Sequence, residues 1–277
     1  MPLHAHPAQY KRSPRKLLLS FFGEFLWQEQ REQVRARAVI HALEGAGLNA
    51  PAVRAALERK VFKGMLSRTK RGREVEYALT PHTEQVLRDA QERVLGERPF
   101  DPVGEGWSLV LFSLPDESQP TRHRLRSLLA WEGFAPFGRG AWIAPGEVDF
   151  DALRAATTSS LQADTVVAFR AHEADGFSMS GAVDATWNIS AIADAHHRFA
   201  DIWAPGLEAG MAATESPMAL RTMLIADWLD LLKQDPRLPA QHLPSEWPAD
   251  ASHKLFLRWY RELAAPSIEE LRSLLGE

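Results

Sequence analysis

The spacing of hydrophobic residues predicts several helices near the start of the chain. In residues 15–28 the apolar side chains Leu18, Phe22, Phe25 and Leu26 fall on one face of a helix. The apolar run lies beside basic residues and superficially resembles a signal peptide. No small-residue cleavage site follows it, so we expect a helix of the folded protein.

Two further helices are marked by residues that favour helix ends. The segment 35–48 is apolar at helical spacing and closes with glycines, which commonly end helices. Asn49 is a preferred N-cap residue, and Pro51 fits the first turn of a third helix that runs to about Lys63.

A β-hairpin is predicted after the third helix. Residues 65–80 contain two short strands around an Arg-Gly turn, and a fourth helix, capped by Thr80, extends to about Leu95. Three helices followed by a hairpin with a basic tip is the layout of a winged helix-turn-helix. We therefore expect a DNA-binding domain over 15–98, preceded by a flexible tail over 1–14.

The middle of the chain alternates between strands and helices. A linker rich in glycine and proline covers 99–106, and a second domain is expected over 107–175. Its predicted strands and helices are, in order, strand 107–115, helix 121–133, strands 134–138 and 141–145, helix 149–160 and strand 164–171. The order β-α-β-β-α-β is that of a ferredoxin-like sandwich. Enzymes, RNA-binding proteins and dimerisation modules all use this fold, so the order alone indicates no function.

The last part of the chain, 184–277, is predicted to be a helical domain that serves effector binding or dimerisation. Apolar residues recur there at helical spacing, and Ser216 with Pro217 forms a typical helix start. The whole chain is therefore expected to belong to the α+β class.

Charge is distributed unevenly between the two ends of the chain. Residues 1–98 hold 18 Lys and Arg against 11 Asp and Glu, a balance of +7, whereas residues 99–277 have a balance of −11. A basic N-terminal third joined to an acidic remainder favours contact between one end and a polyanion.

Composition excludes several classes of protein. The 277 residues are 45% hydrophobic and 25% charged, which is typical of a globular protein, and no apolar run is long enough to cross a membrane. The absence of cysteine excludes disulfides, cysteine-based zinc sites and thiol catalysis. We expect a cytoplasmic protein without a resident cofactor.

The third helix and the hairpin carry the candidate DNA contacts. Val53 and Leu57 can face the core, which leaves charged residues on the opposite face, where an arginine could donate two hydrogen bonds to a guanine edge. Cations on the hairpin would meet phosphates or the minor groove. The expected DNA-binding residues are Arg54, Glu58, Arg59, Lys63, Lys70, Arg71 and Arg73.

The most specific sequence block, 107–145, contains a W-x-L-V-x-F-S-L-P strand, an R-x-x-L-R-x-x-L helix and a G-x-W-I-x-P turn. With the segments PRKLLLSFFGEFL, APAVRAALERKVFKGML, LRTMLIADWLDLLKQDPRLP and HLPSEWP, in that order along the chain, these motifs resemble the PaaX family of bacterial transcriptional repressors. Members of that family control aromatic acid catabolism such as phenylacetate degradation.

The resemblance implies a winged-helix reader of double-stranded operator DNA and a central domain similar to a small CRISPR-associated nuclease. It further implies a homodimer that releases DNA when phenylacetyl-CoA or a related aryl-acyl-CoA binds. One departure concerns residues 225–230, which read IADWLD where the family usually carries histidine and basic residues. The change removes positive charge that could meet the CoA phosphates.

The C-terminal part holds the candidate effector contacts. Aromatic residues at helical spacing are most often core, although a bundle with many large rings can also leave a pocket for an aromatic acyl group. The nearest cations could pair with an acidic ligand. The expected effector-binding residues are Arg198, Arg221, Trp228, Arg258 and Trp259.

Two further functions remain possible from the sequence. A metal-dependent nuclease could use Asp116 and Glu117 after the first strand of the central domain, although no second metal-holding group is evident nearby. The adjacent His196 and His197 point about 100° apart on a helix and cannot easily share one metal ion. An activator of transcription is equally compatible with DNA binding.

Overall fold

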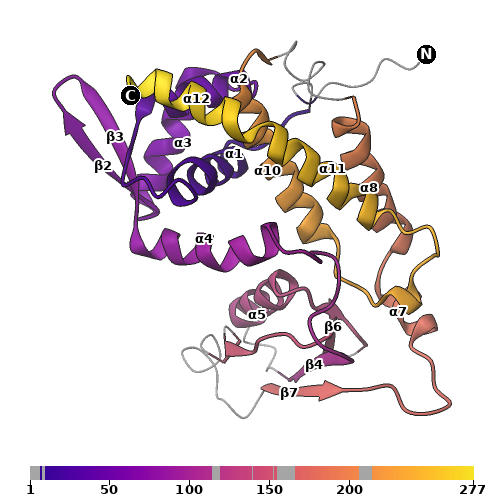
Figure 1. The fold of residues 1–277 in the computed structure, drawn as a ribbon. Coiled ribbons are helices and arrows are strands. Elements are labelled where there is room, and N and C mark those ends of the chain that lie inside the picture. The colour runs from indigo at the N-terminus through magenta and orange to yellow at the C-terminus, as the bar shows by residue number, and fades with distance from the viewer. Residues whose placement is uncertain are drawn as a thin grey trace. The chain divides into compact units, whose positions relative to one another are not determined.

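The structure is a computed structural model, and its contacts divide the chain into two compact units (Figure 1). The described residues are 7, 10–113, 119–138, 140–151, 153–154, 166–205 and 214–277. Unit 1 comprises 1–97, 196–231 and 248–277, and unit 2 comprises 98–195 and 232–247. The expected N-terminal and C-terminal domains therefore pack together within unit 1.

Unit 1 begins with a helix that changes pitch. Helix α1 (Pro14–Phe22) starts at Ser13, whose side chain accepts a hydrogen bond from the backbone N–H of Lys16. It continues as the π-helix η2 (Gly23–Trp27). Segments of π-helix are uncommon and often occur at functional sites. The short strand β1 (Val34–Arg35), which the sequence did not predict, follows.

The next two helices confirm the sequence prediction. Helix α2 spans Ala36–Gly45 and helix α3 spans Ala50–Phe62. The Asn49 side chain accepts a hydrogen bond of 2.9 Å from the Ala52 N–H, as expected for an N-cap.

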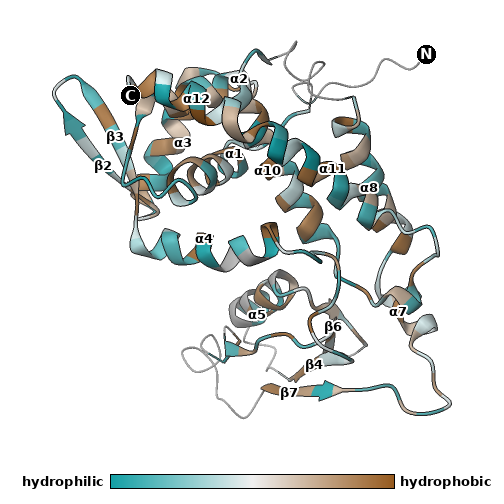
Figure 2. Cartoon of the chain, in the orientation of Figure 1, coloured by the Kyte–Doolittle hydropathy of each residue, from teal (hydrophilic) through white to brown (hydrophobic). Residues whose placement is uncertain are grey.

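The hairpin and the fourth helix complete the N-terminal part. Strands β2 (Leu66–Arg71) and β3 (Glu74–Leu79) pair antiparallel, and β1 adds to β3, giving the order β1-β3-β2. Gly72 in the turn has a φ of +63°, which glycine adopts without steric cost. Helix α4 (Pro81–Val94), capped by Thr80, is hydrophilic along most of its length (Figure 2). This is the order of elements that the winged helix-turn-helix prediction requires.

The C-terminal helices of unit 1 enclose an aromatic core. They are the second half of α8 (Ile189–Trp203), most of α10 (Pro217–Gln234), α11 (Ala249–Glu262) and α12 (Ala264–Leu275). Trp228 stacks on Phe256 with ring centroids 4.2 Å apart, and Trp259 meets the edge of Trp203 at 5.0 Å. Helix α12 packs against α2 (Figure 1).

Unit 2 contains a four-stranded antiparallel sheet. Its elements are β4 (Trp107–Phe112), α5 (Gln119–Trp131), β5 (Ala135–Pro136), β6 (Ala141–Pro145) and β7 (Val166–Ala171). The strand order β5-β6-β4-β7 is that of the predicted ferredoxin-like sandwich. Most of the predicted helix 149–160 lies outside the described residues.

Each face of this sheet carries its own hydrophobic cluster. On one face Val110 packs with Leu125 and Leu129 of α5. On the other, Trp107 stacks on Trp187 with ring centroids 5.9 Å apart, next to the short helices α7 (Ser180–Thr186) and η5 (Ala240–His242).

A buried ion pair joins the N-terminal and C-terminal parts of unit 1. Arg221 of α10 donates to Glu24 Oε1 of η2 from Nε at 2.9 Å and from Nη2 at 2.5 Å. The Tyr260 hydroxyl of α11 donates to the same oxygen at 3.0 Å, and its ring lies 4.3 Å from the guanidinium. Burial, followed by the Glu24 charge, raises the pKa of Tyr260. The Tyr260 hydroxyl therefore keeps its proton and acts as a donor.

A second contact anchors residues that were expected to form a flexible tail. Arg12 lies in that segment, yet its guanidinium donates two hydrogen bonds to Asp227, one of them 2.7 Å long, and the Trp203 indole donates to the same carboxylate at 3.1 Å. Together with the cap at Ser13, this contact shows that the end of the segment is fixed. Burial nevertheless raises the pKa of Asp227, and the bonds from Arg12 partly offset the increase.

Removal of one partner of the Glu24–Arg221 pair is expected to destabilise the protein strongly. Arg221→Met would leave the Glu24 carboxylate buried without its cation, and such changes cost about 3–5 kcal/mol. Chemical denaturation measures the loss. The control is Lys16→Ala at the exposed pair with Asp230, which should cost below about 1 kcal/mol. A loss for Arg221→Met as small as that of the control would contradict a stabilising role for the pair.

Substitution of Arg12 is expected to make stability depend on pH. Arg12→Met removes the cation beside Asp227, so the pKa of Asp227 rises further above its unfolded value of about 3.9. When the pKa of a group is higher in the folded state than in the unfolded chain, the free energy of unfolding falls as pH rises through the folded pKa. The folded state binds the proton more tightly than the unfolded chain does, and this advantage is lost when the proton dissociates. The variant should lose about 3 kcal/mol at pH 7.5 and distinctly less at pH 5 in urea titrations. The same substitution in an Asp227→Asn background should show no such difference, and a loss equal at both pH values would refute the assignment.

Candidate nucleic-acid interface

Helix α3 presents a charged face to solvent. Arg54, Glu58, Arg59 and Lys63 are all exposed, as the sequence predicted. The opposite face is buried in unit 1 and contains Val53, Ala56 and Leu57. The helix is therefore fixed by its apolar side, and its charged side is available to a partner.

Lys60 lies on the inner face of α3 and differs from the other cations. Only 8% of the residue is exposed, and its Nζ lies 3.2 Å from the Met65 sulfur. Burial, together with the nearby charges of Arg15 and Lys63, lowers the pKa of this ammonium. Lys60 therefore belongs to the support of the helix rather than to its charged surface.

The hairpin adds cations beside α3. Lys70, Arg71 and Arg73 are exposed at its tip, which is hydrophilic in Figure 2. Arg71 Nε pairs with Glu76 at 3.1 Å, whereas the described part of the chain shows no acidic partner for Lys70 or Arg73.

One ion pair ties the hairpin to α3. Arg68 of β2 donates to Glu58 of α3 at 2.7 Å, and both side chains remain about half exposed. This contact places the hairpin and the charged face of α3 on one surface. Sequence reasoning named Glu58 but not Arg68, because only the observed register shows that Arg68 projects toward α3.

Sequence reasoning also missed Phe62, the last residue of α3. Its side chain is 92% exposed, although the residue type predicts burial. The four-residue spacing from Glu58 to Phe62 is a signal that could have placed it on the outer face.

The predicted effector-binding residues do not share one site in this structure. Trp228 and Trp259 are at most 1% exposed, and their indole N–H groups donate to the backbone oxygens of Val94 and Trp203. Arg221 is engaged with Glu24, as described above. Arg198 and Arg258 are exposed.

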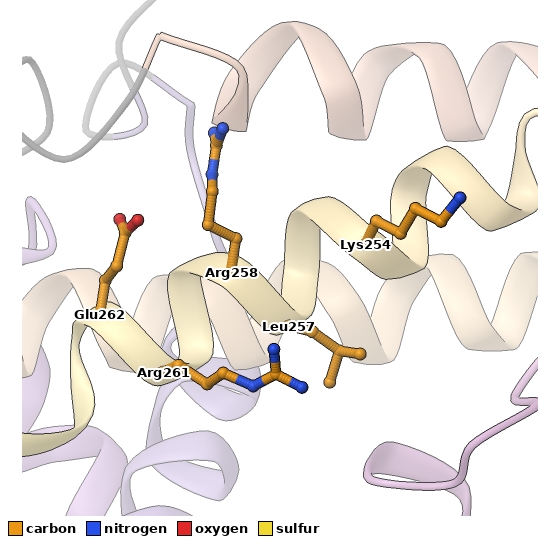
Figure 3. Close-up of a pocket in the computed structure, with 5 residues that line it drawn as sticks. All are labelled: Lys254, Leu257, Arg258, Arg261 and Glu262. Atoms are coloured by element: carbon orange, nitrogen blue, oxygen red, sulfur yellow. The ribbon is translucent and has the colours of Figure 1, made fainter.

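An open groove lies along α11 and includes Arg258. Its volume is about 470 Å³, and Figure 3 shows the side chains that line it. In that view the Arg261 guanidinium extends toward Leu257. The lining residues are Lys254, Leu257, Arg258, Arg261 and Glu262. The lining thus has three cations, one carboxylate and one apolar side chain, and of the cations Arg261 extends toward Leu257 whereas Lys254 and Arg258 point away from it (Figure 3). The excess of cations suits an anionic ligand.

Comparison with protein families accounts for most of the sequence. The model of a PaaX-like protein matches residues 13–83, that of the PaaX protein central Cas2-like domain matches 101–183, and that of the PaaX-like protein C-terminal domain matches 187–273. The chain belongs to the PaaX family. The resemblance inferred from the sequence motifs is thereby confirmed.

Two relatives of this PaaX-family chain extend the comparison. It is 24% identical to the transcriptional repressor PaaX of Escherichia coli K12 over 261 residues, which cover 91% of this chain and 81% of the relative. The solved structure of an uncharacterized protein, Rv0674 of Mycobacterium tuberculosis, matches with a TM-score of 0.59 at 22% identity and covers 93% of this chain and 98% of that chain. The structural likeness supports the α+β fold.

The two acidic residues of the segment 225–230 are both paired with cations in the structure. Asp227 pairs with Arg12, and the carboxylate of Asp230 lies 2.5 Å from the Lys16 ammonium. The two acidic residues are thus balanced by cations from the N-terminal segment. These two ion pairs join the N-terminal and C-terminal parts of unit 1.

The structure describes only some of the metal ligands that the sequence suggested. No group of three or more His, Asp or Glu side chains that could hold a metal ion occurs in those ranges. Asp116 and Glu117 lie outside them. His196 is buried with Nδ1 3.0 Å from the Ser252 hydroxyl, whereas His197 is exposed, so the two histidines point apart. Across the described ranges, no helix has the length and apolar character that a membrane span requires.

Proposed function

We propose that this PaaX-family protein is a transcriptional repressor that binds double-stranded operator DNA through α3 and the β2–β3 wing. The observation that carries the proposal is the outer face of α3, where Arg54, Arg59 and Lys63 are exposed beside the wing cations Lys70 and Arg73. A polyanion could contact both elements at once, because the Arg68–Glu58 pair joins them on one surface. The similarity to a repressor favours a regulator over an enzyme, and a repressor over an activator.

The two elements would have different tasks on DNA. Helix α3 fits the major groove, where an arginine can donate two hydrogen bonds to guanine O6 and N7. The wing cations would contact phosphates, which orient the protein but carry no sequence information. Arg71 would have to leave Glu76 to do so, which makes Lys70 and Arg73 the better candidates.

A homodimer would present two such surfaces to a pseudo-palindromic operator. Half-sites would then lie about 34 Å apart, one helical turn of DNA, or a multiple of that distance. By analogy with the family, the controlled genes would serve the catabolism of a phenylacetate-like aromatic compound.

The effector of the proposed repressor would be phenylacetyl-CoA or a related aryl-acyl-CoA. The groove on α11 supports this proposal because Lys254, Arg258 and Arg261 could pair with phosphate groups while Leu257 meets an apolar part. Release of DNA would follow from a population shift. The thioester would bind more tightly to the conformation that cannot bind DNA than to the conformation that can. The predicted contacts at Trp228 and Trp259 would require the aromatic core to open.

Substitutions on α3 and on the wing are expected to affect DNA binding differently. Arg54→Ala should weaken binding to a preferred duplex about 5- to 100-fold and binding to random DNA far less, because it removes a base contact. Lys70→Ala combined with Arg73→Ala should weaken both and reduce the slope of log affinity against log salt by about 2. Fluorescence anisotropy over a range of salt concentrations measures both effects. Equal losses on the two DNAs for Arg54→Ala would exclude a base-reading role.

Neutralising the groove is expected to impair release without impairing DNA binding. The double variant Lys254→Ala, Arg261→Ala should raise the phenylacetyl-CoA concentration for half-release about tenfold, because each exposed charge contact contributes about 0.5–1 kcal/mol. The residues lie outside α3 and the wing, so operator affinity without thioester should stay unchanged. Glu262→Gln, which leaves the cations in place, serves as the control. Unchanged release by the double variant would remove the groove from the effector site.

A further inference from the structure

The most exposed large hydrophobic side chain in the described part of the protein is on α3. Phe62 is 92% exposed, compared with 79% for Phe177 and 50% for Phe169 in unit 2. A single exposed apolar side chain needs no explanation by itself. Phe62 requires an explanation because it lies on the charged outer face of α3.

Helical geometry places Phe62 at the centre of that outer face. Residues separated by three, four or seven positions share one side of a helix, so Phe62 lies in line with Ala55 and Glu58. Arg54 lies on one flank of this line, and Arg59 and Lys63 lie on the other. The buried residues of α3 are on the opposite side of the helix, namely Val53, Ala56, Leu57 and Lys60.

The end of α3 is held firmly, so the backbone that carries the ring has a defined position. The chain turns at Gly64, whose φ is +66°, and the Met65 N–H donates back to the Lys60 oxygen at 3.0 Å. The Thr80 hydroxyl donates to the Gly64 oxygen at 2.8 Å, and the Thr83 hydroxyl donates to the Met65 oxygen at 2.7 Å. The junction between α3 and the wing is therefore held by hydrogen bonds to the start of α4.

We propose that Phe62 reads sequence directly, by packing its ring against the 5-methyl group of a thymine in the major groove. The inference rests on the proposed function, in which α3 enters that groove. Among the base edges exposed there, thymine offers the C5-methyl group as its apolar feature, and phenylalanine is one of the side chains that contact it. Phe62 adds apolar recognition to the hydrogen bonds from the flanking arginines.

The surroundings of the ring favour DNA over an apolar protein partner. A protein-docking surface gathers several apolar side chains and few charges at its centre. The exposed neighbours of Phe62 are instead Glu58, Arg59 and Lys63, with Ala55 as the small apolar member. A lone ring among charged side chains, with Arg59 and Lys63 as cations and Glu58 paired with Arg68, suits a polyanion that carries isolated methyl groups.

The test combines a protein substitution with removal of one methyl group from DNA. Duplexes selected from a random pool by the full-length wild-type protein are used as probes, and each thymine is replaced in turn by deoxyuridine. At the contacted thymine the wild-type protein should lose about fourfold in affinity, the factor that corresponds to one buried methyl group. Phe62→Ala should bind both duplexes equally, whereas Phe62→Leu should keep part of the preference.

The control variant is Phe177→Ala, which removes an exposed phenylalanine of unit 2 and should retain the fourfold difference. Phe62 is exposed, so Phe62→Ala should unfold at the wild-type temperature, which thermal unfolding verifies.

If the wild-type protein selects a motif but Phe62→Ala discriminates thymine from deoxyuridine as well as the wild type does, the inference is wrong. It is equally wrong if no thymine in the motif is sensitive to the replacement. If the wild-type protein selects no motif at all, the proposed DNA-binding function itself fails.

Discussion

The buried contact between Glu24 and Arg221 is the constraint on which unit 1 depends. It joins residues 197 positions apart, with Arg221 donating to Glu24 at 2.5 Å and Tyr260 donating to the same carboxylate oxygen at 3.0 Å. A charge pair removed from water is stable only when its hydrogen bonds are satisfied. The first helix packs against α2 and α3, and its continuation η2 is joined through Glu24 to α10 and α11. Any ligand that rearranges those helices must also act on this pair.

Under the proposed function, this arrangement would let one chain combine a rigid surface for DNA with an interior that responds to a ligand. The outer face of α3 and the wing are fixed by caps, by strand pairing and by the Arg68–Glu58 contact. The C-terminal helices carry the cationic groove around Arg258, and they share the aromatic core with Trp228. A change in the packing of that core would reach the first helix through groups in direct contact, which is one physical route for coupling between two sites.

Local features were predictable from the sequence, and long-range packing was not. Asn49 and Thr80 identified the starts of α3 and α4 because a cap is a property of a few adjacent residues. The strand order of unit 2 followed from its alternation of elements. The grouping of the N-terminal and C-terminal parts into unit 1 had no local signal, because it depends on pairs such as Arg12 with Asp227, 215 residues apart. Phe62 was missed although its signal was local, because phenylalanine in an amphipathic helix is normally assigned to the core.

The central claim is that unit 1 reads DNA sequence, and the most direct test compares two duplexes. Fluorescence anisotropy of the full-length protein would be measured on the DNA upstream of its own gene and on a shuffled duplex of the same length and composition, at one salt concentration. Charge alone binds both duplexes equally, whereas base reading distinguishes them. The account predicts a preference of at least about a thousandfold for the upstream duplex, as specific DNA-binding proteins show. Equal affinity for the two duplexes would contradict it.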